Sequence, residues 1–448
     1  MKKKTTVPTV GLVSLGCAKN AVDLQVMAGH LLAAGFELAA PGAPADVMLV
    51  NTCAFIEAAR EEAADEILRA CEMKSAGTCR AVVVSGCFAQ RYGEKLTEAF
   101  PDVDAWVGID SLDSIAELVQ GVLSDPEQIF FNVDSRLPSR VFDPPLPALR
   151  FTSPAFAYLK IAEGCAHRCS YCAIPGIRGK YRSRKVNAIV KEAKALLASG
   201  VKELNVIAQD PMLYGVDFQD GTNLVALLKR LDRLPGEFWL RVLYSYPSEI
   251  TDEYLEWLNT SPHAVKYVDV PVQHTDPAVL KAMARGSAAV ATLSAATRLR
   301  TAVPGVTLRT TVMTGFPGET PEAFQRLLAD VKEMAFDHLG AFAFSPEEGT
   351  AAAKLPNRPS LKEARRRERQ VMAVQRRVWA AKAKTFVGRE YAALVVEPGV
   401  ARMASQAPEV DGVVRLAKKG RRPLPPVGEF VQVKILQVED FDFVGEVV

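Results

Sequence analysis

The spacing of three cysteines constrains this chain of 448 residues more than any other feature. Cys165, Cys169 and Cys172 lie four and three residues apart in one loop, so their thiolates can hold three irons of a four-iron cluster and leave the fourth without a protein ligand. An open metal position is where a small molecule can chelate. A structural zinc site is the alternative, but zinc favours a second close pair of Cys or His, and no such pair follows. The spacing therefore predicts an iron-sulfur cluster with one open corner.

The length of 448 residues predicts two to four domains, and the composition is that of a globular protein. The hydrophobic fraction is 49% and the net charge is +2, which excludes a disordered chain and one that seeks polyanions over its whole surface. Lys2-Lys3-Lys4 precedes only a short apolar run broken by Pro8, unlike a signal peptide, and no run approaches the roughly 20 apolar residues of a membrane helix. Eight cysteines without an export signal indicate reduced thiols, so we expect a cytoplasmic protein with no membrane partner.

Apolar runs alternate with helical patterns from residue 9 to about residue 130. The runs cover residues 10–15, 47–50 and 81–84, and each precedes a stretch with helical periodicity. This alternation is typical of βαβ units, whose parallel sheet is covered by helices on both faces. The expected fold class is therefore α/β, beginning with an amino-terminal open parallel sheet.

A cysteine follows each of these three runs, just before the next helix, at Cys17, Cys53 and Cys87. The carboxyl ends of the strands in an open α/β sheet meet at one crevice, so we expect a second cluster site built from three cysteines that are distant in sequence. The alternative is that they are ordinary buried cysteines. Cys71 closes a predicted helix and Cys79 precedes a strand, so both are expected near the opposite edge as structural residues.

Prolines between residues 135 and 154 resist regular structure and predict an extended linker. Apolar runs then recur at residues 155–161, 203–208, 239–244, 266–272, 307–313 and 339–344, which predicts a central partial (βα)6 barrel. Chemistry in such barrels sits on the loops after the strands. Those loops carry the cysteine triad, Gln209-Asp210, Ser245-Tyr246-Pro247, Gln273-His274 and residues 315–319 and 345–349.

Beyond Pro356 the chain becomes basic and then β-rich. Nine Lys and Arg between residues 362 and 384 face only Glu363 and Glu368 on a predicted helix. A solvated charged face is the ordinary explanation, and a surface that meets RNA in a ribonucleoprotein is the sharper one. Runs at residues 391–396, 413–416, 430–436 and 443–448 predict a small carboxyl-terminal β-barrel. The predicted segments are a domain over 1–137, a linker over 138–154, a barrel with the basic helix over 155–384, and the small β-barrel over 385–448.

These features together resemble the methylthiotransferases, a family of radical S-adenosylmethionine enzymes, over almost the whole chain, with the last domain similar to a TRAM barrel. The local sequence is similar to the subgroup that methylthiolates an aspartate of protein S-twelve in the small ribosomal subunit. Ala18, Leu24-Gln25 and Pro211-Met212 depart from the pattern of that subgroup. The similarity rests on residues 16–23, 163–175, Arg178-Gly179, 182–184, 244–247, 315–320 and 407–412.

The resemblance implies two [4Fe-4S] clusters and S-adenosyl-L-methionine as cofactors, and an external electron donor as a partner. One cluster cleaves S-adenosylmethionine to a radical that removes hydrogen from the aspartate β-carbon, and the other carries the sulfur. The resemblance also places Tyr171 beside the adenine and makes Gly315, Gly318 and Glu319 lining residues of its site. The metal ligands are Cys17, Cys53 and Cys87 for one cluster and Cys165, Cys169 and Cys172 for the other.

Two alternatives keep the same cysteines. One is a tRNA methylthiotransferase acting on a modified adenosine, and the other is a non-catalytic iron-sulfur protein that binds RNA through its β-barrel. Residues 386–448 carry nine acids against eight bases, whereas an RNA clamp needs a surplus of cations. A basic ribosomal protein should prefer carboxylates, so we expect it to meet Glu409 and Asp411, together with the acids at 439, 440 and 442.

Overall fold

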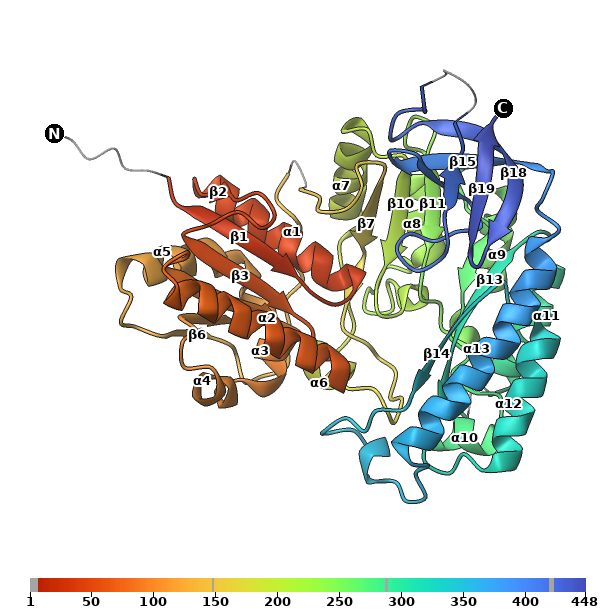
Figure 1. The fold of residues 1–448 in the computed structure, drawn as a ribbon, viewed down its shortest axis with the longest axis horizontal. Helices are drawn as coiled ribbons and strands as arrows, with labels where there is room; N and C mark the ends of the chain where they lie inside the picture. Colours follow the sequence, from red (N-terminus) through yellow and green to blue (C-terminus); the bar gives the residue numbers. More distant parts are fainter. Residues whose placement is uncertain (1–6, 147–148, 287–288, 419–422) are drawn as a thin grey trace. The chain divides into compact units, whose positions relative to one another are not determined.

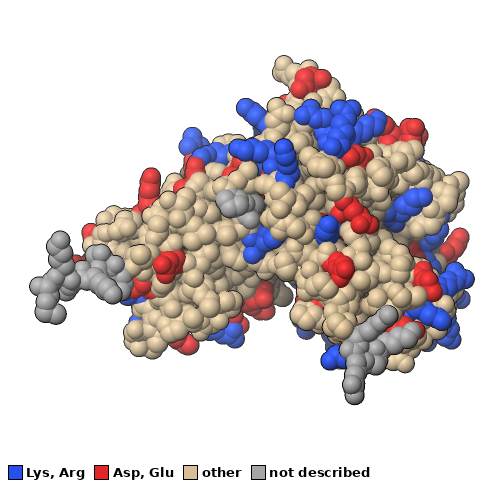
Figure 2. Space-filling model, turned by 90° about the horizontal axis from the view of Figure 1, so that it is seen from above, with Lys and Arg blue, Asp and Glu red and all other residues tan. Residues whose placement is uncertain are grey.

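The computed structural model describes residues 7–146, 149–286, 289–418 and 423–448 (Figure 1). The chain divides into two compact units. The first runs to Phe151 and includes Lys160–His167 and Cys172–Ala195, and the second comprises Thr152–Leu159, Arg168–Tyr171 and Leu196–Val448. The predicted domain boundaries remain predictions. On the face drawn in Figure 2, basic and acidic side chains are interspersed, in keeping with the net charge of +2.

The first unit contains a six-stranded sheet in the order β2-β1-β3-β4-β5-β6. All neighbouring strands are parallel, and β3 and β4 are buried along their whole length. The predicted open parallel sheet is confirmed, and the short strands β2, β5 and β6 extend it at its two edges. The strands are β1 (Thr9–Ser14), β2 (Glu37–Leu38), β3 (Val47–Thr52), β4 (Ala81–Gly86), β5 (Ala105–Val107) and β6 (Phe130–Asn132).

Helices cover both faces of this sheet because successive strand residues point to opposite sides. Leu49 and Val83 pack against α1 (Ala18–Ala33) and α5 (Ile115–Ser124) on one face. Val50 and Val84 pack on the other face against α2 (Glu57–Ser75), α3 (Cys87–Tyr92) and α4 (Lys95–Ala99). The sheet is therefore the middle layer of three.

The proline-rich segment is irregular, as predicted, with no helix or strand in its described part between β6 and residue 156. It is not a free spacer, however. Phe142 belongs to the apolar core beside α1, and the ring of Pro145 lies so close to Gly29 that a Cβ there would be 3.0 Å from it. The backbone N–H groups of Ser139 and Arg140 donate to the Asp110 carboxylate. Pro147 lies outside the described residues.

The six parallel strands of the central barrel follow in chain order, as predicted. They form two three-stranded sheets, β11-β10-β7 and β12-β13-β14, joined by a parallel bridge between Leu240 and Ala264. Helices α8 (Leu224–Leu231), α9 (Asp252–Thr260), α11 (Ala289–Ala302) and α12 (Pro321–Met334) lie between the strands in sequence, which is the partial (βα)6 barrel. The strands are β7 (Phe156–Lys160), β10 (Glu203–Ile207), β11 (Trp239–Val242), β12 (Tyr267–Asp269), β13 (Thr307–Thr314) and β14 (His338–Ala343).

The basic segment forms α13 (Leu361–Ala383), which packs against α12 and β14 (Figure 1). A closed barrel in the order β15-β16-β17-β19-β18 follows. It contains one strand more than predicted, β16 (Val400–Met403). None of the described helices combines the length and the apolar composition needed to cross a membrane. The other strands are β15 (Glu390–Glu397), β17 (Val414–Leu416), β18 (Phe430–Glu439) and β19 (Asp442–Val447).

Candidate cluster and cofactor sites

The first three predicted cysteines lie at the carboxyl ends of three adjacent strands of the first unit. Cys17 is the N-cap residue of α1 after β1, Cys53 directly follows β3, and Cys87 begins α3 directly after β4. Neighbouring strands are about 5 Å apart, so three adjacent strand ends span about 10 Å. That span suits a cluster of several irons. No group of three His, Cys, Asp or Glu in the described part of the chain has the geometry for a single metal ion.

The sheet order places these cysteines at its topological switch point. The chain leaves β1 into α1 on one face and leaves β3 into α2 on the other face. The loops after these neighbouring strands therefore diverge at the sheet edge, and such a switch point is where open α/β sheets bind ligands. The geometry supports the prediction that distant cysteines share one crevice.

Gly16 explains how the loop that carries Cys17 approaches Cys53. Its φ is +91°, in the left-handed region that favours glycine, and a Cβ on it would lie 2.7 Å from the Cβ of Cys53 and 3.1 Å from its sulfur. A larger residue at position 16 would push the two cysteine-bearing loops apart.

Burial keeps two of these thiols protonated when no metal is bound. Burial raises the pKa of Cys87 to about 12, although the Arg178 guanidinium opposes the change. Burial also raises the pKa of Cys53, while Cys17 is exposed. Iron binding must therefore displace protons from the buried thiols.

Cys71 and Cys79 lie in the apolar cluster beneath α2. The Cys79 thiol donates to the carbonyl of Ala70 at 3.8 Å, and burial raises the pKa of Cys71 to about 11. This apolar packing favours the prediction that both are structural. All eight cysteines lie in described residues, and none is in a disulfide.

The loop with the second cysteine triad is anchored at its centre. Within the second unit, the Ser170 N–H donates to Met283 O at 3.0 Å, its hydroxyl donates to Ala282 O at 2.7 Å, and its carbonyl accepts from the Ala352 N–H at 2.8 Å. Cys165, Cys169 and Cys172 are half-buried. Cys165 and Cys172 belong to the first unit and Cys169 to the second.

Tyr171 is buried within the second unit among aromatic and cationic neighbours. Its ring meets the ring of Phe316 edge to face at 6.5 Å, and its hydroxyl accepts from Arg285 Nη1 at 3.5 Å. The Arg285 guanidinium also lies 4.2 Å from the centre of the Tyr246 ring and donates to Pro271 O at 2.8 Å. Arg285 was missed by sequence reasoning because it lies outside the strand-end loops and carries no motif.

Buried polar atoms without partners gather on the loops after the barrel strands. Gln209 Oε1 follows β10, Ser245 Oγ follows β11 and Gln273 Oε1 follows β12, and none has a hydrogen-bond partner among the described residues. Leaving such a group unsatisfied costs about 1–3 kcal/mol. A bound polar ligand would satisfy them, so the predicted face of the barrel fits a cofactor with many donors and acceptors, as S-adenosylmethionine has.

Close packing against a helix requires glycine at position 315, in the turn over residues 315–319. A Cβ on Gly315, whose φ is +74°, would lie 2.2 Å from the Cβ of Ala364 in α13, whereas a Cβ on Gly318 would meet nothing within 4 Å. The buried Glu319 carboxylate accepts from the Gly315 N–H and from Arg367 Nη1, the latter at 2.8 Å. Its other oxygen lies 3.2 Å from His274 Nε2. Through these contacts Glu319 stabilises the turn.

The prediction that Asp411 is available to a protein partner is wrong. Its side chain is 1% exposed, and one oxygen accepts from the Tyr267 hydroxyl at 2.6 Å and from the Ala407 N–H at 2.8 Å. Glu409 is exposed but accepts from the Tyr158 hydroxyl at 2.5 Å. These carboxylates fasten the loop before β17 to the barrel strands β7 and β12.

Three of the nine predicted cations of α13 are engaged within the second unit, and one of them, Arg366, pairs with Glu363 at 2.7 Å. Arg367 is buried and pairs with Glu319 and Glu363, and Lys382 pairs with Asp337 at 2.6 Å. The prediction that Arg367 belongs to an open basic face is therefore wrong. Val371 and Trp379 of this helix are buried, and Met372, Val374 and Val378 are half-buried.

Comparisons with known proteins now define the class and then the family. Residues 159–331 match the radical SAM superfamily, residues 387–448 match the TRAM domain, and residues 9–108 match the uncharacterized protein family UPF0004. The chain is therefore a radical SAM enzyme. It is 42% identical to the ribosomal protein uS12 methylthiotransferase RimO of Syntrophus aciditrophicus, with 98% of each chain covered. It is 40% identical to the RimO of Pelobacter propionicus, with 98% and 97% covered. The chain belongs to the RimO family of methylthiotransferases.

A solved structure with a similar fold supports the architecture. The radical S-adenosylmethionine methyltransferase TsrM from Kitasatospora setae matches with a TM-score of 0.55 at 17% identity, covering 75% of this chain and 72% of that one. At this identity the likeness concerns the fold alone.

Proposed function

We propose that the protein methylthiolates the β-carbon of an aspartate in ribosomal protein uS12. The observation that carries this proposal is full-length similarity to relatives named for that activity, in a chain that brings three cysteines to one sheet edge and retains a second triad on the barrel loop. The nearly even charge of residues 386–448 favours a protein substrate over tRNA. We infer that the enzyme works in the cytoplasm, where ribosomes are assembled.

The donor sets fit two iron-sulfur clusters. Each set offers three thiols and no fourth cysteine, which suits a cluster with one open iron. When bound, the barrel cluster with S-adenosylmethionine supplies a carbon-centred radical, the chemistry needed to remove hydrogen from an unactivated carbon. An external electron donor is a further proposed partner, because neither substrate carries the electron for this cleavage. The ligands are Cys17, Cys53 and Cys87 for one cluster and Cys165, Cys169 and Cys172 for the other.

Protein side chains position the cofactor in this proposal. Tyr171 lies against the adenine, with its hydroxyl held by Arg285. Gly315 and Gly318 line the site through their backbone, and Glu319 fixes that turn by accepting from the Gly315 N–H. The unpartnered oxygens of Gln209, Ser245 and Gln273 supply further polar contacts. Burial of these groups excludes water from the place where a radical would form.

Mass spectrometry tests the proposed reaction. The reconstituted enzyme with S-adenosylmethionine, a sulfur source, a reductant and small ribosomal subunits should add a methylthio group to an aspartate-containing peptide of uS12. Transfer RNA in the same reaction serves as the competing substrate. Methylthiolated tRNA with unmodified uS12 would contradict the proposal.

We also propose that α13 contacts ribosomal RNA phosphates near the substrate protein. Six of its cations are exposed and have no ion-pair partner among the described residues. At 3.6 residues per turn they fall within about 120° of one helix face and extend over about 33 Å. We call them the basic stripe: Lys362, Arg365, Arg369, Arg376, Arg377 and Lys384.

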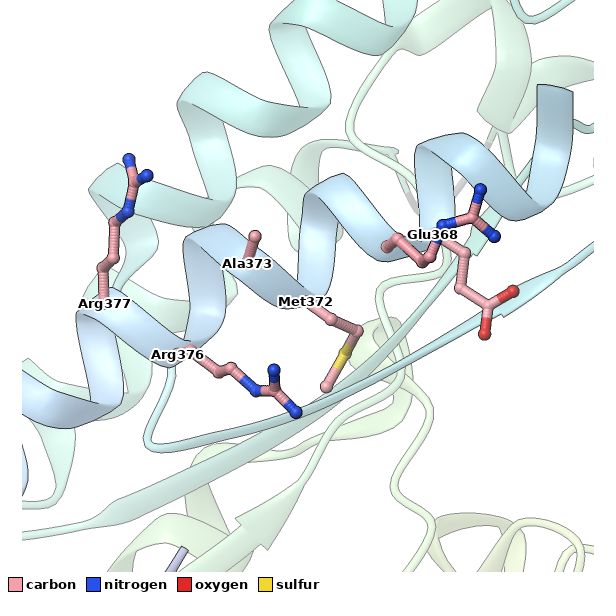
Figure 3. A pocket seen from close by; sticks show the side chains of 6 residues that line it. Glu368, Met372, Ala373, Arg376 and Arg377 are labelled. Atoms are coloured by element: carbon pink, nitrogen blue, oxygen red, sulfur yellow. The ribbon is translucent and has the colours of Figure 1, made fainter. Parts of the chain in front are cut away.

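The middle of the basic stripe is hollowed (Figure 3). Glu368, Arg369, Met372, Ala373, Arg376 and Arg377 line this hollow. In Figure 3, Arg376 and Met372 extend on one side of Ala373 and Arg377 on the other. The small side chain at position 373 gives a phosphate access to the flanking guanidinium groups. Surface cations that already pair with a carboxylate are less available to a phosphate, because the carboxylate neutralises their charge.

Salt dependence of binding measures these phosphate contacts. Each cation that neutralises a phosphate adds about 0.7–0.9 to the slope of log affinity against log salt. Changing Arg365, Arg369, Arg376 and Arg377 to Gln should therefore flatten the slope for small ribosomal subunits by about 3. The matched control changes four surface cations that already have carboxylate partners to Gln: Lys229, Arg298, Arg366 and Arg415. Equal slopes for the two variants, or equal weakening toward RNA-free uS12, would contradict an RNA contact.

A further inference from the structure

A buried ion network in the first unit ends on the sulfur of Cys87. Arg178, the last residue of α6 (Ile174–Arg178), has a side chain 1% exposed. Its Nη2 shares two N–H groups among three acceptors, Asn20 Oδ1 at 2.7 Å, Asp23 Oδ2 at 2.7 Å and Cys87 Sγ at 3.4 Å. Its Nη1 donates to Glu163 Oε2 at 3.0 Å. The guanidinium therefore meets two carboxylates and a predicted iron ligand.

Lys160 completes the network and balances its charge. Its ammonium, 1% exposed, pairs with both Asp23 and Glu163. Two cations thus face two carboxylates in a region closed to water. The Coulombic attraction in such a network does not reliably exceed the cost of desolvating four charges, so stability alone is a weak reason for its presence. Its geometric effect is to hold one guanidinium N–H against the Cys87 sulfur.

The contact with sulfur becomes stronger when Cys87 binds iron. In the metal-free protein the thiol donates to Asn20 Oδ1 at 3.6 Å while it accepts from Arg178. Ligation removes the thiol proton, so the Cys87 sulfur can then only accept. The bond from Arg178 would then join a cation to a thiolate, so its acceptor gains negative charge and the attraction increases.

We propose that Arg178 is a positioning residue that raises the reduction potential of the amino-terminal cluster through Cys87. Hydrogen bonds to cluster sulfurs are among the factors that set these potentials, and groups beyond the ligands tune metal sites generally. The reduced cluster carries more negative charge, so the guanidinium stabilises it more than the oxidised cluster. This inference rests on the proposed cluster at Cys17, Cys53 and Cys87.

The position of Arg178 in the chain gives the inference a further consequence. Arg178 is six residues beyond Cys172, a proposed ligand of the other cluster. Ala173 and Ile177 of this stretch pack in the same apolar cluster as Phe88 and Ala89 of α3. The segment that follows the second triad therefore supplies the hydrogen bond to the first.

A redox titration monitored by electron paramagnetic resonance tests this role. The parent is the full chain with Cys165, Cys169 and Cys172 changed to Ala, which carries only the amino-terminal cluster. In that parent, Arg178→Gln with Asp23→Asn removes one cation and one carboxylate. The oxidised-to-reduced ratio at the parent midpoint should rise about tenfold, which is about 59 mV for a one-electron couple.

The matched control is Asp23→Asn with Lys160→Met, which removes the same charges from the network but keeps Arg178 beside Glu163 and Cys87. At the parent midpoint potential, the oxidised-to-reduced ratio of this control should stay within about threefold of the parent ratio. Equal shifts in the two variants, or no shift in the Arg178 variant, would overturn the inference. If the double variant does not fold, Arg178→Lys replaces it in the titration. Lys keeps the charge but loses the planar fork, so the shift should lie between zero and the change of about tenfold expected for the double variant. A parent without four irons would instead contradict the proposed function.

Discussion

Changing Cys17, Cys53 and Cys87 together to Ala should abolish the methylthiolated product while S-adenosylmethionine is still cleaved reductively. The three residues are the proposed ligands of the sulfur-carrying cluster, and none belongs to the barrel loop. Loss of a single partner beyond the ligands already costs about 10–100-fold at metal sites, so loss of all three ligands should exceed that. Product is measured by mass spectrometry of uS12, and cleavage by release of deoxyadenosine.

The control for this variant is Cys71→Ala with Cys79→Ala. Both side chains pack in an apolar cluster and lie on α2 and before β4, so product and cleavage should both remain near those of the unmodified protein. Iron content should fall from about eight to about four in the triple variant and stay unchanged in the control, because two four-iron clusters are proposed. Loss of cleavage in a triple variant that retains four irons would contradict independent roles for the two clusters.

The placement of the amino-terminal cysteines at adjacent strand ends was predictable because it depends on backbone topology. Runs of Val and Leu predicted strands, and the parallel sheet brings the residues that follow its strands to one edge. The sequence placed Cys53 and Cys87 after β3 and β4, and the structure has both directly at those strand ends. No long-range side-chain geometry was needed for this prediction.

The network around Arg178 was not predictable from periodicity. Its charged members come from α1, from the end of β7, from β8 (Ala162–Glu163) and from α6, and each looks like an ordinary charged residue in the local pattern. The similarity to family motifs at residues 16–23, 163–175 and 178–179 touched Asp23, Glu163 and Arg178, but not Lys160. Pairing of buried charges depends on tertiary packing, which a single sequence does not specify.

Charge counting failed for the loop before β17 for the same reason. Asp411 counts as one acid among nine whether it faces solvent or, as observed, Tyr267 and Ala407. The strand β16 was missed because Arg402 interrupts its short apolar run. Arg402 is buried, however, and one guanidinium nitrogen contacts the Glu203 carboxylate.

Glu203 should be the residue whose loss most destabilises the second unit. Its carboxylate on β10 is fully buried between two guanidinium groups, with Arg241 Nε at 2.7 Å and Arg402 of β16 in contact. Arg241 also donates to Ala404 O at 2.9 Å and to Gln406 O at 3.2 Å. Removing one member of a buried ion pair leaves an uncompensated charge and costs about 3–5 kcal/mol. Glu203→Gln leaves two such charges.

The midpoint of urea unfolding of the metal-free protein measures this loss, with Glu253→Gln as the control. Glu253 pairs with Lys229 at 3.1 Å on the surface, where both side chains are about half exposed, and exposed pairs contribute about 0–1 kcal/mol. The midpoint should therefore fall clearly for Glu203→Gln and hardly for Glu253→Gln. Equal midpoints would show that the two arginines are satisfied by carbonyl oxygens alone.

The pH dependence of the same comparison tests whether charge is the cause. Burial raises the pKa of Glu203, but Arg402 and Arg241 outweigh burial and hold the pKa below its usual value. A carboxyl with a lowered pKa in the folded state stabilises the protein above its unfolded pKa of about 4.3 and loses that effect as the pH falls through the folded value. The difference between the unmodified protein and Glu203→Gln should thus be constant from about pH 5 to pH 8 and shrink in more acidic solution. Gln keeps the shape of the side chain and removes only its charge, so a difference independent of pH would contradict charge as the cause.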